Sequence, residues 1–433
     1  MTMQIISLLC LVGAIVFGFV RKTNVGIVSL GLSMALGMLG GMSAGDIYGG
    51  FPYKLFLTLL GTMFFFSLLQ ENGTLQKVSE WLTGLCGDKI FLVPILIYVI
   101  SFLLSAAGPG AISVQTVMVL FAVPMALHMG INPVLMGAMA ILGAVGGTAS
   151  PIALTGIIVD ELLADMGITG QGMKIFIGVS VANLACAVVT YLVFRGWKMK
   201  APAAVTADNA IAADSAGPAD TGKKGKVQFE KKQLISTLML LIMVVLVVGF
   251  SYDIGLVCLT LAFIMIIFRL GNEQKALKLI PWGTLILIVG VSVLMNITQK
   301  LGGIDLLADI LASMMNKRTA APLMGLTGGI MSWFSSANGV VFPTLIPAVP
   351  SIAEQVGGAS LLQMVVAIVC SATVAGISPL STGGSIVLAS YAQETDADEK
   401  EQSSIFIRLF GLSALCVATV FVLTLVGLLS FLG

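Results

Sequence analysis

The sequence predicts an all-α polytopic membrane protein made of two inverted repeats, each with five transmembrane helices, one re-entrant hairpin and discontinuous helices. Composition is the first observation behind this prediction. Hydrophobic residues make up 58% of the chain and charged residues 10%, and the mean hydropathy is +1.05. A soluble globular domain carries about 25% charged residues, so this composition indicates a chain that lies mostly within a membrane.

The second observation is an internal repeat, in which residues of the first half recur 229 positions later. The matching pairs are Gln4 and Gln233, Ser7 and Ser236, Gly26 and Gly255, Pro52 and Pro281, Gly61 and Gly290, Gln70 and Gln299, and Gly73 and Gly302. Small slips then bring Ser105 onto Ser335 and Ser150–Pro151 onto Ser378–Pro379. Repeated hydrophobic units are typical of membrane carriers, whose two halves enclose a site near the bilayer midplane.

Apolar runs in the first copy predict five transmembrane helices, at residues 4–20, 24–42, 53–70, 132–159 and 174–195. Between the third and fourth runs, another apolar stretch extends from Ile90 to Leu127. Glycine and proline at Ala106–Gly110 interrupt it, because neither residue continues a helix well. Arms of about 16 residues are marginal for crossing about 30 Å of hydrocarbon, so we expect a re-entrant hairpin here.

The second copy repeats this pattern, with helices expected at 233–250, 254–268, 282–299, 363–390 and 405–430. Its hairpin is expected at 320–350, broken at Ser335–Gly339. Because five crossings is an odd number, the second copy enters the membrane upside down. The predicted domains are a first repeat at 1–197, a flexible cytoplasmic linker at 198–232 and a second repeat at 233–433. The linker is rich in Ala, Asp, Gly, Pro and Lys and has no apolar periodicity.

Charge predicts which way up the repeats lie. With the linker in the cytoplasm, that side holds sixteen basic residues and the other side five: Lys54, Lys174, Lys300, Lys317 and Arg318. The positive-inside rule favours this orientation. We therefore predict a multi-pass protein of a cell membrane, in bacteria the inner membrane.

The expected membrane core is almost free of charge. Residues 90–159, 319–353 and 355–393 contain no Asp, Glu, Lys or Arg. An enzyme needs titratable groups to move protons or to attack a substrate, so we expect no enzyme, no catalytic residue and no resident cofactor. The net charge of +1 predicts no nucleic-acid partner.

Four helix breaks are the candidate site, because each break leaves backbone N–H groups and carbonyls that protein, water or ligand must satisfy. Half-helix N-termini suit a carboxylate and carbonyl ends suit Na⁺. The candidates for substrate binding are Gly108, Pro109, Gly110, Thr148, Ser150, Asn338, Gly339, Ser378, Ser381 and Thr382. The candidates for Na⁺, largely through backbone carbonyls, are Ser105, Gly108, Gly147, Ser335, Asn338 and Gly376. Close helix packing is the competing explanation for these small residues.

At these motifs the chain resembles the ion transporter superfamily, and most closely the MatC-type dicarboxylate carriers. The segments Gly40–Pro52 and Glu71–Thr74 are similar to the N-terminal domain of that family. The architecture is similar to the divalent anion/sodium symporters over nearly the whole chain except the linker. This similarity implies a homodimer with a scaffold domain, an elevator-like transport domain, and hairpin tips that bind Na⁺ and substrate carboxylate. The symporters carry Ser-Asn-Thr at each tip, whereas Gly108–Gly110 and Ala337–Gly339 stand here.

These observations predict a secondary active transporter of small dicarboxylates such as malonate or succinate, coupled to Na⁺ or H⁺. A cation/proton antiporter or an organic anion exporter on the same scaffold is the main alternative. An antiporter needs buried Asp or Glu, which the charge-free runs lack. A channel and a membrane-bound enzyme are further alternatives, but paired breaks in inverted repeats favour alternating access.

Overall fold

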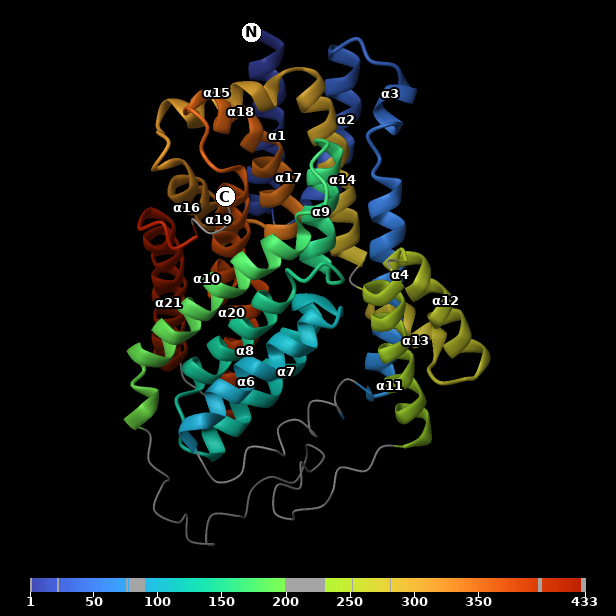
Figure 1. Cartoon of the computed structure of the whole chain (residues 1–433), viewed down its shortest axis with the longest axis vertical. Helices are drawn as coiled ribbons and strands as arrows, with labels where there is room; N and C mark the ends of the chain where they lie inside the picture. Colours follow the sequence, from blue (N-terminus) through green and yellow to red (C-terminus); the bar gives the residue numbers. More distant parts are fainter. Residues whose placement is uncertain are drawn as a thin grey trace, which may run out of the picture.

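The computed structural model describes residues 2–21, 23–74, 77, 90–198, 230–250, 252–280, 282–395 and 399–429. Every regular element within these residues is a helix, and no strand occurs among them (Figure 1). Six helical stretches of the described chain are long and apolar enough to cross a membrane, and they contain α4, α7, α10, α14, α19 with α20, and α21. Most of the predicted linker, residues 199–229, lies outside the described residues, as does Cys86.

The first half of the chain forms its helices close to the predicted positions. They are α1 (Thr2–Arg21), α2 (Val25–Leu39), α3 (Ala44–Tyr48), α4 (Tyr53–Glu71), α6 (Val93–Ala106), α7 (Gly110–His128), α8 (Pro133–Gly147), α9 (Leu154–Asp165) and α10 (Gly172–Val193). Local sequence explains several starts: the side chains of Asn24 and Asn132 accept hydrogen bonds from the first turns of α2 and α8. The helix expected at 132–159 is two helices, α8 and α9, so its predicted interruption is confirmed.

The second half repeats the order of long helices. They are α11 (Lys231–Val244), α12 (Ile254–Ile267), α13 (Glu273–Leu279), α14 (Trp282–Lys300), α15 (Gly303–Ser313), α16 (Ala320–Phe334), α17 (Phe342–Leu345), α18 (Val349–Gln355), α19 (Leu361–Val374), α20 (Thr382–Thr395) and α21 (Glu399–Leu425). The second arm of its hairpin is a series of short turns, because Pro343, Pro347 and Pro350 recur there. The short helices α3, α13, α15 and α18 were not predicted.

The two hairpins approach the centre of the molecule from opposite ends. Figure 1 shows α6 and α7 in the lower half, whereas α16, α17 and α18 lie in the upper half. The first hairpin contains α7, which is itself long and apolar enough to span a membrane by length and composition. Re-entry of this hairpin therefore stays a prediction.

The two halves are in contact through glycines. A Cβ on Gly61 of α4 would lie 2.5 Å from the carbonyl oxygen of Gly255 on α12. In a second contact between the halves, α2 packs against α14 through Gly26 and Gly290. Small residues allow the backbones of membrane helices to approach this closely. Each half therefore contributes one helix to each of the two contacts.

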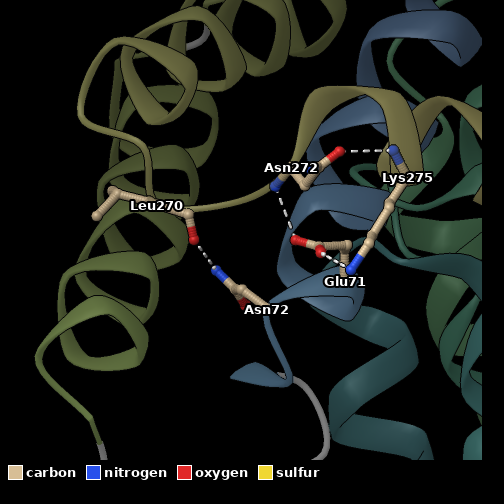
Figure 2. A network of polar contacts seen from close by, with 5 residues as sticks. All are labelled: Glu71, Asn72, Leu270, Asn272 and Lys275. Carbon is tan, nitrogen blue, oxygen red and sulfur yellow. Dashed lines mark hydrogen bonds and ion pairs between the residues drawn. The ribbon is translucent and has the colours of Figure 1, made fainter.

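Polar contacts fasten the end of α4 to the second half (Figure 2). Glu71 Oε2 accepts a hydrogen bond from the backbone N–H of Asn272 at 2.8 Å, and Glu71 Oε1 lies 3.8 Å from Lys275 Nζ. Asn72 Nδ2 donates to the carbonyl of Leu270 at 3.1 Å. The connection between α12 and α13 is therefore held to α4 by both charged and neutral groups.

Candidate functional site

Thr148 organises the break between α8 and α9. Its side chain is fully buried, and Oγ1 accepts hydrogen bonds from the backbone N–H groups of Ala111 at 3.3 Å and Thr155 at 3.4 Å. Its carbonyl accepts from the N–H of Gly156 at 3.0 Å. One residue thus satisfies two of the otherwise unpaired N–H groups at the start of α9. It also connects the break to the tip of the first hairpin, where Ala111 lies.

The tip of the first hairpin depends on glycine. Gly108 and Gly110 have φ of +129° and +78°, which side chains other than glycine rarely adopt. A Cβ on Gly108 would lie 2.5 Å from Phe66 Cζ on α4, and one on Gly110 would lie 3.0 Å from Leu154 Cβ. Pro109 separates the two glycines and ends one arm of the hairpin before the other begins. The tip is consequently a backbone surface pressed between α4 and α9.

Asn338, at the tip of the second hairpin, contacts the first break directly. Its Oδ1 accepts a hydrogen bond from Thr155 Oγ1 at 2.9 Å, across 183 residues of sequence. Beside it, Ser336 Oγ accepts from the N–H of Gly339 at 3.2 Å. The first break and both hairpin tips are therefore joined by Thr148 and Thr155. Thr155 was not among the predicted residues, because its role depends on this long-range partner.

The second break lies between α19 and α20 and is held from α21. The carbonyl of Ala375 accepts hydrogen bonds from the N–H of Ser378 at 2.9 Å and from Ser413 Oγ at 3.1 Å. Ser413 Oγ in turn accepts from Trp333 Nε1 at 2.9 Å. Ser378 is fully buried and its Oγ accepts from the N–H of Leu380 at 3.3 Å. The chain therefore turns sharply at Ser378 before α20 begins.

The predicted site residues differ in how accessible they are. Thr148, Ser150 and Ser378 are buried, Asn338 and Ser381 are half-buried, and Thr382 at the first position of α20 is exposed. The first break is thus enclosed by the protein, whereas the second opens to the surface at Thr382. Contact with a substrate stays a prediction for each of these residues.

The candidate Na⁺ ligands are neutral oxygens. Within the described part of the chain, no group of three His, Cys, Asp or Glu residues could hold a metal ion. Ser105 is fully buried and its Oγ has no hydrogen-bond partner, whereas Ser335 Oγ donates to the carbonyl of Met331 at 2.7 Å. Gly147 packs against Ser105, since its Cβ would lie 3.0 Å from Ser105 Cβ. A cation held here would be coordinated by hydroxyl and carbonyl oxygens, which suit hard cations such as Na⁺.

A cavity of about 640 Å³ with polar and apolar lining lies between α4, α9, α14 and the second hairpin. Lys54 and Glu161 both line it and form an ion pair, with 3.1 Å between Nζ and Oε2. Asn296 and Lys300 of α14 also line it, together with Asp165 at the end of α9. Burial, and to a smaller extent the charge of Glu161, raises the pKa of Asp165 above its usual value. This cavity could not be predicted from the sequence, because its lysines and acids are far apart in the chain.

Long apolar helices, interrupted near two hairpin tips that contact each other through the first break, define a multi-pass membrane protein. Residues 12–336 match the CitMHS family, described as citrate transporters, and the chain belongs to this family. It is accordingly a secondary transporter of citrate-type anions, and not an enzyme. No curated protein matches the chain.

Proposed function

We propose that this chain carries a small di- or tricarboxylate across a cell membrane, bound at the helix breaks and coupled to Na⁺ or H⁺. The hydrogen bond between Thr155 and Asn338 is the observation that supports this proposal most directly. It brings a hairpin tip of one half to a helix break of the other, as a site between two halves requires. Citrate, succinate and malonate share the carboxylates that such N–H and hydroxyl groups bind.

Inverted repeats are part of the proposal, and the contacts between the halves support them. Gly26 packs on Gly290, and Gly255, which matches Gly26 at the 229-residue offset, packs on Gly61, which matches Gly290. Likewise, Gly302 lies beside Gln4, and the matching Gly73 lies beside Gln233. Two copies related by a twofold axis make each contact twice with the partners exchanged. From the resemblance to the divalent anion/sodium symporters, we also propose that the hairpins move like an elevator against a dimeric scaffold.

An antiporter or an exporter is the alternative on the same scaffold. Its strongest support is the group of acids that faces the cavity, Glu161 and Asp165, because proton exchange needs titratable carboxyls. However, Glu161 is already paired with Lys54. The helix breaks themselves are formed by hydroxyl, amide and backbone groups. This chemistry favours binding an organic anion over exchanging a cation for protons.

Purified protein in liposomes tests the function directly. Uptake of labelled citrate, succinate and malonate is measured under imposed Na⁺ and proton gradients, each applied separately. We expect uptake of at least one of these anions that one of the two gradients accelerates. An antiporter would instead move Na⁺ or protons without any carboxylate. Absence of carboxylate uptake under every gradient would contradict the proposal.

A further inference from the structure

We propose that the cavity between α4, α9, α14 and the second hairpin is an entry site for the transported anion, in which Lys54 and Lys300 bind its carboxylates. The inference rests on the proposed function and adds a site ahead of the helix breaks. Glu161 holds Lys54 in an ion pair and is displaced when the anion binds. Lys54 lies on α4 in the first half and Lys300 on α14 in the second, so both halves contribute to this site.

The cavity lies on the side of the molecule away from the linker. In Figure 1, α3, which comes directly before α4, lies in the upper part of the molecule, whereas α11, which follows the linker, lies in the lower part. Gly49 and Gly50, which join α3 to α4, line the cavity. Lys54 and Lys300 are two of the five basic residues that the sequence assigns to the non-cytoplasmic face. We therefore expect the cavity to receive the anion from that side.

One face of α14 leads from the cavity toward the second hairpin tip. Ser292, Asn296 and Lys300 line the cavity at a spacing of four residues, which places them on one face of the helix. Ser292 is about 7.5 Å along the helix from Leu287, at 1.5 Å per residue. Leu287 in turn packs against Gly339 of the tip, whose Cβ would lie 2.6 Å from Leu287 Cγ. The inner end of the cavity is thus about two turns of α14 from this tip.

One face of α9 leads from the same cavity toward the first break. Glu161 and Asp165 line the cavity four residues apart, again on one side of their helix. Glu161 is about 9 Å along α9 from Thr155, whose hydroxyl donates to Asn338. The cavity therefore lies next to both elements that the Thr155–Asn338 contact joins, as an entry site to the helix breaks requires.

The two lysines are available to an anion. Lys300 is exposed, and within the described part of the chain no carboxylate lies within 4 Å of its ammonium group. Lys54 Nζ lies 3.1 Å from Glu161 Oε2, but 61% of the Lys54 side chain is exposed. Exposed ion pairs contribute little to stability, because water and salt screen them. An anion with two or more carboxylates can therefore displace Glu161 from Lys54 while it also contacts Lys300.

Asn296 adds a neutral donor between the charged groups. Its Oδ1 is buried without a hydrogen-bond partner, and a Cβ on Gly50 would lie 3.3 Å from this atom. Because the Oδ1 end of the carboxamide packs against Gly50, the Nδ2 end remains to donate to a ligand in the cavity that Asn296 lines. A carboxylate accepts such a hydrogen bond more strongly than a neutral group does.

The two acids of α9 allow the anion to leave the cavity again. Glu161 competes with the anion for Lys54, and Asp165 adds a second negative charge on the same face. A transport path needs binding that is favourable enough for entry and weak enough for release. Removing Lys54 and removing Glu161 should therefore change the affinity for the anion in opposite directions. An ion pair that only supported the fold would respond alike to the loss of either partner.

The experiment compares the wild type with Lys54→Gln, Lys300→Gln and Glu161→Gln in proteoliposomes. The control is Lys317→Gln, which removes an exposed lysine expected on the same face of the membrane but outside the cavity lining. Initial rates of citrate uptake are measured against citrate concentration at low and at high ionic strength. Equal melting temperatures in detergent without citrate show that the variants are folded.

We expect the KM for citrate to rise about three- to tenfold in Lys54→Gln and in Lys300→Gln at low ionic strength. The KM of Glu161→Gln should fall about two- to fivefold, because Lys54 loses its competitor. High ionic strength should reduce both differences, since salt screens exposed charges, and Lys317→Gln should match the wild type throughout.

A change of KM in the same direction in Lys54→Gln and Glu161→Gln would overturn the entry site, and so would wild-type KM in both lysine variants. In either case uptake by the wild type would leave the proposed function standing. Absence of citrate uptake by the wild type under every gradient would instead overturn the proposed function, and the entry site with it.

Discussion

Gly26 on α2 and Gly290 on α14 pack so closely that a Cβ on Gly290 would overlap the carbonyl oxygen of Gly26. The matching pair, Gly61 and Gly255, makes the corresponding contact between α4 and α12. Beside the first contact, Asn24 accepts a hydrogen bond from the N–H of Gly26 and donates one to the carbonyl of Gly283 on α14. At the glycines themselves the backbones touch, so any added atom pushes them apart.

Gly290→Ala should destabilise the protein, because the new methyl group meets backbone that cannot rotate away. Overpacking of a tight interior costs about 1–3 kcal/mol. Thermal unfolding in detergent measures the effect as a lower melting temperature. Gly31→Ala on α2 is the matched control, since nothing lies within 4 Å of its Cβ position. Equal melting temperatures for the two variants would contradict the packing described here.

Asn338→Ala should weaken the apparent affinity for substrate about ten- to a hundredfold, since a charge-assisted hydrogen bond contributes about 1.5–3 kcal/mol and 1.4 kcal/mol is a factor of ten. Thr155→Val removes only the bond that orients Asn338 and should raise KM about three- to tenfold. Thr155→Ser keeps the hydroxyl group and should have the KM of the wild type. If Asn338 and Thr155 act together, the double variant should be little worse than Asn338→Ala. Additive losses would mean that the two residues act separately.

Thr382→Ala tests the open break and Thr148→Ala the enclosed one. Thr382 is exposed at the start of α20, so its loss should raise KM about tenfold without affecting stability. Loss of the Thr148 hydroxyl leaves the N–H groups of Ala111 and Thr155 without an acceptor and should lower the melting temperature as well. KM and melting temperature are measured for both variants. A Thr148→Ala protein with the melting temperature and KM of the wild type would contradict the role of Thr148 in holding the first break.

Gly339→Leu should abolish transport while the protein still inserts into the membrane. A Cβ on Gly339 would already lie 2.6 Å from Leu287 Cγ on α14, so a larger side chain forces the second tip away from the site. The control is Gly411→Leu on α21, where the Cβ position has nothing within 4 Å. Uptake is measured at equal amounts of reconstituted protein. Normal uptake by Gly339→Leu would show that the tip does not take part.

Cysteines introduced at residues 205–225 should react with impermeant thiol reagents only from the cytoplasm. These positions lie outside the described residues, and the prediction rests on the sixteen basic residues assigned to that side: Arg21, Lys22, Lys77, Lys89, Arg195, Lys198, Lys200, Lys223, Lys224, Lys226, Lys231, Lys232, Arg269, Lys275, Lys278 and Lys400. Asn316→Cys, before α16, should react only from outside. The reverse pattern in intact cells would invert the topology.

The helix breaks could be predicted because glycine and proline act locally. Gly146–Pro151 and Gly376–Gly384 interrupt their helices where the sequence places them, whatever packs around them. The short helices α13 and α15 were not predicted, because long apolar runs indicated the helices, whereas both of these segments are short and charged, with Lys275 and Lys278 in α13 and Asp305 and Asp309 in α15.

The partners of the site could not be predicted. Thr155 contacts Asn338 across 183 residues. In the sequence, Thr155 is an ordinary polar residue inside an apolar run. Only tertiary packing shows that the Thr148 hydroxyl pairs with the N–H groups of Ala111 and Thr155.

The contacts at the end of α4 in Figure 2 have a consequence for how the chain enters the membrane. At the 229-residue offset, Glu71 matches Lys300 and Asp46 matches Lys275, so both matched positions change sign. Lys275 lies 3.8 Å from Glu71, whereas the Asp46 carboxylate accepts hydrogen bonds from the backbone N–H and the hydroxyl group of Ser43. An ion pair thus holds the junction at α13, and a capping residue holds α3.

The short helices that precede α4 and α14 nevertheless differ in charge: α3 is acidic, whereas α13 is basic. The insertion machinery retains loops with Lys and Arg in the cytoplasm. Expressed separately, the two halves should therefore insert in opposite directions. Exchanging the charges of Glu71 and Lys275 would keep their ion pair while erasing part of the signal by which a nascent chain distinguishes the two faces of the membrane.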